Sequence, residues 1–307
     1  MKGNAEEIDA SCAPGAKDFF TNYVQANRPL VIRGGATSWR AFSEWSADRL
    51  SEKYGDKIVK VAPLEVSGEH AHLDKWLESA DLWEHKEEEY CCDPNQVLVV
   101  SALRVKMRLR TFFKRLKAPE EHSFYADGAG NLDHSFPFLR GDFSPPAFAA
   151  KLQLKRADLW LGGKSISRMH YDNLDNVFAQ VVGSKTFVLS PPDSGAAFQG
   201  GKRLRKAARL YTNPGSFTRQ GGGVLHETVL NYCAMERSQM DDLPTTTVTL
   251  HPGDVLCKSR RKQSTHTHNA LLTSCLRLPR TRPTRHFCST VRYRAHSLRS
   301  MFTCFLI

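Results

Sequence analysis

The residues from His170 to Asp193 read HYDNLDNVFAQVVGSKTFVLSPPD, and they determine which fold this 307-residue sequence predicts. The run is rich in β-branched and aromatic residues and ends at a pair of prolines. It follows Trp160-Leu161-Gly162-Gly163, where the paired glycines favour a turn. The resulting order of strand, turn and strand is typical of an all-β barrel or jelly roll.

The first residues of this run place an imidazole and a carboxylate two positions apart. Residues two apart in an extended strand share a face, so His170 and Asp172 are expected to project to the same side. Such a pair supplies two of the three ligands of the facial triad that holds non-haem iron(II) and leaves positions open for a cosubstrate and oxygen. The motif alone is short, and a solvent-facing or hydrogen-bonded pair is the alternative interpretation.

A lysine follows the histidine at a distance of fifteen residues. Lys185 begins an apolar run, Phe187-Val188-Leu189, in which a buried ammonium is costly unless an anion meets it. A dicarboxylate cosubstrate is an anion of the required kind.

The combined pattern resembles the JmjC oxygenases of the cupin superfamily, in particular the small protein hydroxylases. These include the asparaginyl hydroxylase that inhibits hypoxia-inducible factor and the JmjC lysyl hydroxylases. The resemblance runs from about Asn27 to Leu256 and is densest between Asp158 and Asp193. It implies a mainly β double-stranded β-helix (cupin or jelly roll) with N-terminal helices and strands. It also implies iron(II), 2-oxoglutarate and O2 as reactants.

The resemblance also implies roles for individual residues, with His170 and Asp172 as the first two iron ligands. Charge-assisted hydrogen bonds from a lysine and hydroxyl groups would orient the keto acid. The residues implied to hold 2-oxoglutarate are Lys185 and Tyr125 at the distal carboxylate, Ser167 in a place usually held by threonine, and Asn176 near the other end.

The family pattern breaks after Leu256. Thr245 to Leu256 resembles the strand and the G-D-x-L turn that precede the third ligand, a histidine about eleven residues after the glycine. Counting from Gly253, that position is Ser264, so the third ligand is missing where it is expected. His266 and His268 lie just beyond and are secondary candidates, because a ligand needs a rigid, supported position.

Residues 257–307 differ in composition from the rest of the chain. They hold eleven of the 43 Lys and Arg residues and no Asp or Glu, which leaves 32 basic and 32 acidic residues before them. The net charge of +11 therefore belongs to the tail. Cys257-Lys258-Ser259 can be encoded by TGT-AAG-TC, which contains GTAAGT, a common intron start. We interpret the tail as translated intron or a shifted frame, which sequencing of the transcript across codon 257 tests.

The sequence accordingly divides into three parts. We predict an N-terminal helical and β extension over 1–120, a JmjC core over 121–256, and a disordered basic tail over 257–307, so that the C-terminal strands of the fold are missing or replaced. Within the extension, a helix over 16–27 is expected to precede a strand at 30–33. Arg104 to Lys117 carries seven basic residues around Leu and Phe at helical spacing, which favours an amphipathic helix with a solvated face over a nucleic-acid face.

Cysteine usage and hydropathy suggest a compartment. Four of the eight cysteines lie before residue 257, with no CxxC pair, and favour reduced thiols in the cytoplasm or nucleus. No run approaches the roughly 18 apolar residues that a membrane span needs, so no membrane partner is expected. The expected partner is a protein substrate rather than nucleic acid. A homodimer is a possible state of an intact family member.

The predicted function is hydroxylation of a protein side chain. This chain is expected to be inactive if the third iron ligand is absent. Three alternatives stay open: demethylation of N-methyl-lysine, a non-catalytic cupin-like interaction protein, and nucleic-acid binding. Release of formaldehyde would indicate demethylation. Iron-dependent formation of succinate would exclude the non-catalytic alternative. Binding of RNA or DNA that weakens with salt would indicate a nucleic-acid partner.

Overall fold

The computed structural model describes the chain in segments. The described residues are 5–65, 80–83, 96–102, 105–117, 122–126, 132–162, 164–172, 174–191, 203–213, 216–218, 244–258, 263–269, 272–276 and 301–306.

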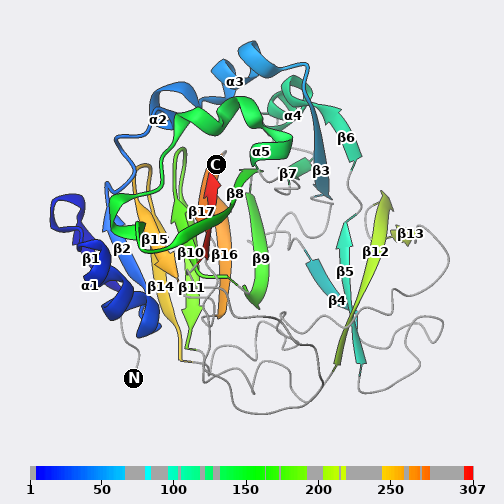
Figure 1. Cartoon of the computed structure of the whole chain (residues 1–307). Helices are drawn as coiled ribbons and strands as arrows, with labels where there is room; N and C mark the ends of the chain where they lie inside the picture. The colour runs from blue at the N-terminus through cyan, green and yellow to red at the C-terminus, as the bar shows by residue number, and fades with distance from the viewer. Residues whose placement is uncertain are drawn as a thin grey trace, which may run out of the picture.

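Two β-sheets dominate the molecule (Figure 1), as the mainly β jelly-roll prediction requires. The smaller sheet has the order β14 (Thr246–Leu250), β11 (Lys185–Ser190), β16 (Gln263–Asn269) and β9 (Lys164–Tyr171). The larger sheet runs β1 (Glu6–Asp9), β2 (Leu30–Arg33), β15 (Val255–Lys258), β10 (Asn176–Ala179), β18 (Met301–Leu306), β8 (Gln153–Gly162), β7 (His122–Ala126), β3 (Ile58–Glu65) and β6 (Val105–Arg108), with β17 (Leu272–Leu276) also paired to β8.

Alternation of side chains along the central strands gives the larger sheet two buried faces. In β10, Phe178 packs between the two sheets, whereas Val177 and Ala179 on either side of it pack beneath the N-terminal helices. The neighbouring strand β15 repeats this arrangement, with Leu256 between the sheets and Cys257 toward the helices. Strands covered on both faces contain consecutive apolar residues, as these two do.

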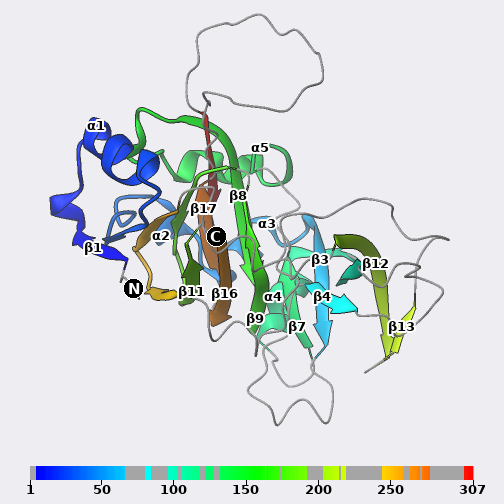
Figure 2. The same cartoon turned by 90° about the horizontal axis from the view of Figure 1, so that it is seen from below.

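The helices lie on the outer side of the larger sheet (Figure 2), and the described ones are short. Their bounds are α1 (Ala16–Phe19), continued by the π-helical turn η2 (Phe20–Gln25), α2 (Ala41–Glu44), α3 (Ala47–Tyr54), α4 (Leu109–Leu116), α5 (Leu132–Ser135) and the 3₁₀ turns η1 (Ala10–Cys12), η4 (Pro137–Asp142) and η5 (Ala147–Ala149). The predicted helix over 16–27 followed by a strand at 30–33 is confirmed. None of the described helices is long and apolar enough to cross a lipid bilayer.

Helix α4 confirms the amphipathic prediction. Leu109, Phe112 and Phe113 are buried in the core cluster, with 1%, 0% and 2% of their surface exposed. The basic side chains of the same segment face solvent. Burial of two phenylalanines and a leucine contributes several kcal/mol, at about 1.5–3 kcal/mol for each side chain, and fixes α4 against the sheet.

The turn before β15 is fixed by Asp254. Its carboxylate accepts hydrogen bonds from the Arg33 guanidinium at 2.6 Å and from the backbone N–H groups of Gly34 at 3.2 Å and His251 at 2.9 Å. Gly253 has a φ of +99°, and a Cβ there would lie 2.8 Å from Thr37 Cγ2. The Gly-Asp pair thus sets the direction in which β15 enters the larger sheet.

A third sheet stands apart from the two main sheets in Figure 1 and has the order β13 (Ser216–Thr218), β12 (Arg203–Asn213), β5 (Gln96–Ala102) and β4 (Ala80–Trp83). It combines strands from before and after residue 120, as the larger sheet does. The division into 1–120 and 121–256 stays a prediction.

The tail contains strands where the sequence analysis predicted disorder. Strand β16 pairs with both β9 and β11, β17 pairs with β8, and β18 lies between β8 and β10. The expectation of a disordered 257–307 is therefore corrected for these strands, and the expectation that the C-terminal strands of the fold are missing or replaced stays a prediction. The physical reason is that β9, β10 and β11 expose backbone groups that need partners, and Thr-rich alternation in β16 is compatible with a strand. The origin of the tail as intron or shifted frame stays a prediction.

Candidate metal and cosubstrate site

The proposed ligand pair lies at the end of β9. His170 is the penultimate residue of the strand, and Asp172 follows its last residue. His170 Nε2 lies 3.8 Å from Asp172 Oδ1, and the two side chains are 15% and 6% exposed. This distance agrees with the expectation that the two side chains share a side, and their role as metal ligands stays a prediction.

Asp172 is held by donors from two neighbouring strands. Its Oδ2 accepts a hydrogen bond of 2.6 Å from Asn176 Nδ2 and one of 3.2 Å from Lys258 Nζ. Asn176 begins β10, Lys258 ends β15, and the two are paired in the antiparallel register. The strand pairing therefore brings an amide and an ammonium to the same carboxylate oxygen.

Lys258 is a member of this site that the sequence analysis did not identify. Its side chain is fully buried, and its ion pair with Asp172 joins two charges that are both withdrawn from water. It lies two residues after Leu256, and alternation places it on the same inner face of β15. Extending the strand pattern by two residues would have found it, but the sequence analysis ended the strand at Leu256.

The amide of Asn176 donates to the aspartate, and its predicted place near the other end of 2-oxoglutarate stays a prediction. Its Oδ1 is buried without a hydrogen-bond partner in the structure, which leaves an acceptor available next to Asp172. A cavity of about 10 Å³ lies beside it, lined in part by Tyr23, Cys257 and Lys258. That volume is near the lower limit for one water molecule.

The third ligand is not found among the described residues. The register of β16 against β9 places Ser264, the residue eleven positions after Gly253, opposite His170. His266 lies opposite Ser167 after a register shift, and His268 lies opposite Lys185. The side chains of these two histidines are outside the described part of the structure. No group of three His, Cys, Asp or Glu able to hold a metal occurs among the residues whose side chains are described.

The described donors therefore do not fit an iron(II) centre. A facial triad needs three ligands with open positions on the opposite side. Here the described side chains supply His170 and Asp172 as two possible ligands, and an ammonium binds one oxygen of the aspartate.

Lys185 lies at the start of β11 and is 1% exposed. Its Nζ lies 5.2 Å from the centre of the Phe178 ring and 5.1 Å from that of Phe187, and the two rings pack edge to face at 4.7 Å. The negative faces of aromatic rings attract an ammonium and offset part of the cost of its burial. Lys185 is thus buried, as its apolar run predicted, and its ammonium lies beside rings of the cluster between the two sheets.

Two further predicted residues are placed by their backbones alone. Ser167 lies in β9, and Tyr125 lies in β7 opposite Gly162 of β8. Their side chains are outside the described part, so their contacts with a cosubstrate stay predictions.

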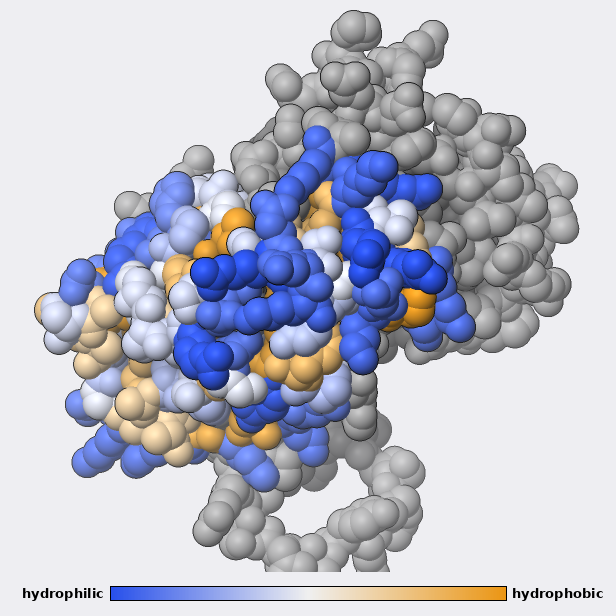
Figure 3. All heavy atoms as spheres, turned by 90° about the horizontal axis from the view of Figure 1, so that it is seen from above, coloured by the Kyte–Doolittle hydropathy of each residue, from blue (hydrophilic) through white to orange (hydrophobic). Residues whose placement is uncertain are grey.

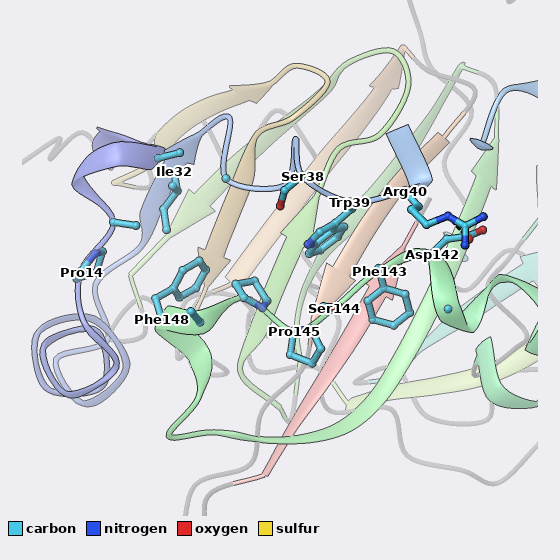
Figure 4. A pocket seen from close by; sticks show the side chains of 16 residues that line it. Pro14, Ile32, Ser38, Trp39, Arg40, Asp142, Phe143, Ser144, Pro145 and Phe148 are labelled. Carbon is cyan, nitrogen blue, oxygen red and sulfur yellow. Dashed lines mark ion pairs between the residues drawn. The ribbon is translucent and has the colours of Figure 1, made fainter. Parts of the chain in front are cut away.

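A separate cavity of about 530 Å³ opens on the helical side of the molecule (Figure 4). Every residue that lines it belongs to 10–40 or 141–148. The rings of Trp39, Phe143 and Phe148 line it, and the ion pair of Arg40 with Asp142 lies at one end. This cavity is built from other residues than the His170 and Asp172 pair.

Curated relatives match about three fifths of the chain. JmjC domain-containing protein E of Dictyostelium discoideum is 25% identical over 201 residues, which cover 61% of this chain and 53% of that protein. Arginine-specific demethylase JMJ22 of Arabidopsis thaliana is 25% identical over 177 residues, covering 58% and 29%. The human tRNA wybutosine-synthesizing protein 5 is 26% identical over 185 residues, covering 57% and 53%. The chain thus spans about half or less of the length of these relatives, and they do not support the asparaginyl hydroxylase subtype.

A family model for the cupin-like domain matches residues 16–257. The match begins at the start of α1, ends within β15 and includes the His170 and Asp172 pair. Relatives that carry JmjC names agree with the jelly-roll architecture. This chain belongs to the cupin-like domain family.

Proposed function

We propose that this chain binds 2-oxoglutarate in the jelly roll of a protein side-chain hydroxylase lineage, and that in its present form it does not oxidise that cosubstrate. JmjC proteins are in general iron(II)- and 2-oxoglutarate-dependent oxygenases, so a 2-oxoglutarate-binding site is consistent with the family. The observation that carries the proposal is the buried Lys185 on β11, together with the register of β16 against β9, in which Ser264 lies opposite His170.

The binding part of the proposal rests on charge. Lys185 Nζ lies in the interior of the double sheet with two aromatic rings beside it. A carboxylate brought to this ammonium gains a charge-assisted hydrogen bond in surroundings of low dielectric constant. No catalytic step is assigned to this chain, because its described donors do not hold a metal.

Calorimetric titration of the full chain with 2-oxoglutarate tests the binding. We expect saturable binding that Lys185→Met abolishes, whereas Lys151→Met, which changes an exposed lysine, leaves it intact. Binding that is equal in the two variants would place the cosubstrate elsewhere. With iron(II), ascorbate and O2, succinate is expected to stay at the level of the no-protein control, and iron-dependent succinate would contradict the absence of turnover.

The double variant Ser264→His/Lys258→Met tests whether the chain derives from a protein hydroxylase. It places an imidazole at position 264 and removes the ammonium from position 258. Incubation with extract proteins under ¹⁸O2 is expected to leave the label on protein side chains. Release of formaldehyde with no retained label would favour demethylation instead.

A second candidate, an RNA substrate, is favoured by the charge of one face. Six exposed basic side chains lie along β6 and α4 or at the end of α4, namely Lys106, Arg108, Arg110, Lys114, Arg115 and Lys117. Asp56 pairs with Arg108 and Arg110, and Asp48 pairs with Lys117, which leaves the face basic overall. The side of the molecule that carries α2, α3 and α4 is largely hydrophilic (Figure 3). One relative is also named for wybutosine synthesis in tRNA.

Fluorescence anisotropy with labelled tRNA separates the two candidates. An RNA substrate requires binding that weakens with salt and that the double variant Lys106→Glu/Lys114→Glu reduces by tenfold or more. The matched control Lys17→Glu/Lys151→Glu makes the same charge change on exposed lysines outside α4. Equal loss in both pairs, or binding that salt does not weaken, excludes this face as an RNA site.

A further inference from the structure

We propose that the ammonium of Lys258 takes the place of a metal ion at Asp172, so that the chain neutralises this buried carboxylate with its own cation and excludes divalent ions. The inference concerns the charge at Asp172 and holds whether or not 2-oxoglutarate binds at Lys185.

The geometry of the pair supports this assignment. Lys258 Nζ lies 3.2 Å from Asp172 Oδ2, and the two side chains are 0% and 6% exposed. The other oxygen, Oδ1, is the one near His170 Nε2. The ammonium and the imidazole thus approach different oxygens of the same buried carboxylate.

The position of Lys258 follows from the fold rather than from a flexible side chain. Asn176 and Lys258 are register partners at the ends of β10 and β15, and both donate to Asp172 Oδ2. The turn before β15 is fixed by Asp254 and Arg33. The ammonium is therefore delivered to the carboxylate by two paired strands.

Electrostatics make the ammonium and a divalent ion mutually exclusive. A metal bound to Asp172 would lie about 2 Å from a carboxylate oxygen, and Lys258 Nζ lies 3.2 Å from Oδ2 of that carboxylate. Like charges on one carboxylate repel strongly in a buried site, where solvent screening is weak. Restoring an imidazole at Ser264 alone therefore leaves an obstacle to metal binding that removal of Lys258 takes away.

Cobalt(II) binding to the full chain, followed by its visible absorption, tests the exclusion. We compare the natural chain, Ser264→His, Lys258→Met and the double variant, with Lys151→Met in the Ser264→His background as a control. The double variant is expected to bind cobalt(II) at least tenfold more tightly than Ser264→His alone, and the control is expected to have no effect. A difference of less than twofold between the double variant and Ser264→His overturns the proposal, as does tight binding by the natural chain.

A double-mutant cycle provides a readout that does not involve metal. Lys258→Met, Asp172→Asn and the pair together are unfolded in urea, and the coupling is expected to exceed tenfold in the folding equilibrium constant. The exposed pair Lys53 and Glu44, at 2.6 Å, is the control and is expected to couple by less than threefold. If Lys258→Met fails to fold while the neutral double variant folds, Asp172 depends on that cation. If both fail to fold, or if coupling is absent, the proposal is wrong.

Discussion

Two buried lysines lie between the sheets, and their surroundings differ. Lys185 on β11 lies against the rings of Phe178 and Phe187, whereas Lys258 on β15 forms an ion pair with the carboxylate of Asp172. The faces of aromatic rings attract an ammonium only weakly. A carboxylate that accepts a hydrogen bond from an ammonium attracts it more strongly and fixes its position. These contacts of the two lysines therefore differ in strength and in direction.

The largest expected difference between the two lysines is in stability. Lys258→Met leaves Asp172 as a buried charge without its cation, which is expected to lower the free energy of unfolding by about 3–5 kcal/mol. Lys185→Met replaces a buried ammonium by an apolar chain of similar length among aromatic rings, and a change within about 1 kcal/mol is expected. Urea denaturation of the two variants measures both values. Equal losses would show that the two ammonium groups are held in the same way.

The sequence predicts one of these lysines and not the other, for a physical reason. Lys185 and the His170 and Asp172 pair follow from alternation within one strand and from the cost of burying a charge, which are local properties. Lys258 acquires its role from the pairing of β15 with β10, and neither strand indicates that register by itself. The register of Ser264 opposite His170 also depends on long-range pairing, and the sequence analysis reached Ser264 only by counting from Gly253 in the family pattern. Helix α4 and the Gly253 turn were predictable because their signals lie within a few residues.

Asn176 offers a smaller test of how firmly Asp172 is held. Asn176→Ala removes a buried hydrogen bond of 2.6 Å to the carboxylate, with an expected loss of about 1–3 kcal/mol in the free energy of unfolding. The loss is expected to shrink in an Asp172→Asn background, because a neutral amide needs the donor less. A loss that stays the same in both backgrounds would mean that Asn176 acts through packing alone.

The aromatic surrounding of Lys185 predicts a further, smaller effect. Phe187→Leu keeps an apolar side chain and removes one ring from the ammonium, with an expected loss of about 0.5–2 kcal/mol for the ring's attraction. The same substitution is then made in the Lys185→Met variant, which has no ammonium to attract. The difference between the two losses in free energy of unfolding is the contribution of the ring's attraction to Lys185. An identical loss in both backgrounds, measured by urea denaturation, would show that the ring contributes only to the core.

Cys257 lies on the opposite face of β15 from Lys258, and its titration tests whether that face is covered. Its thiol packs toward the N-terminal helices, and burial raises the pKa of Cys257 above its ordinary value of 9.0. The folded state therefore keeps the thiol protonated where the unfolded state ionises it, so the unfolded state binds fewer protons above pH 9 and stability falls as the pH rises. One such group contributes a slope of at most about 1.4 kcal/mol per pH unit. Unfolding free energies measured between pH 8 and about pH 10 are expected to decline less steeply in Cys257→Ala than in the natural chain. Equal slopes would mean that the thiol reaches solvent, and β15 would then not be covered on its helical face.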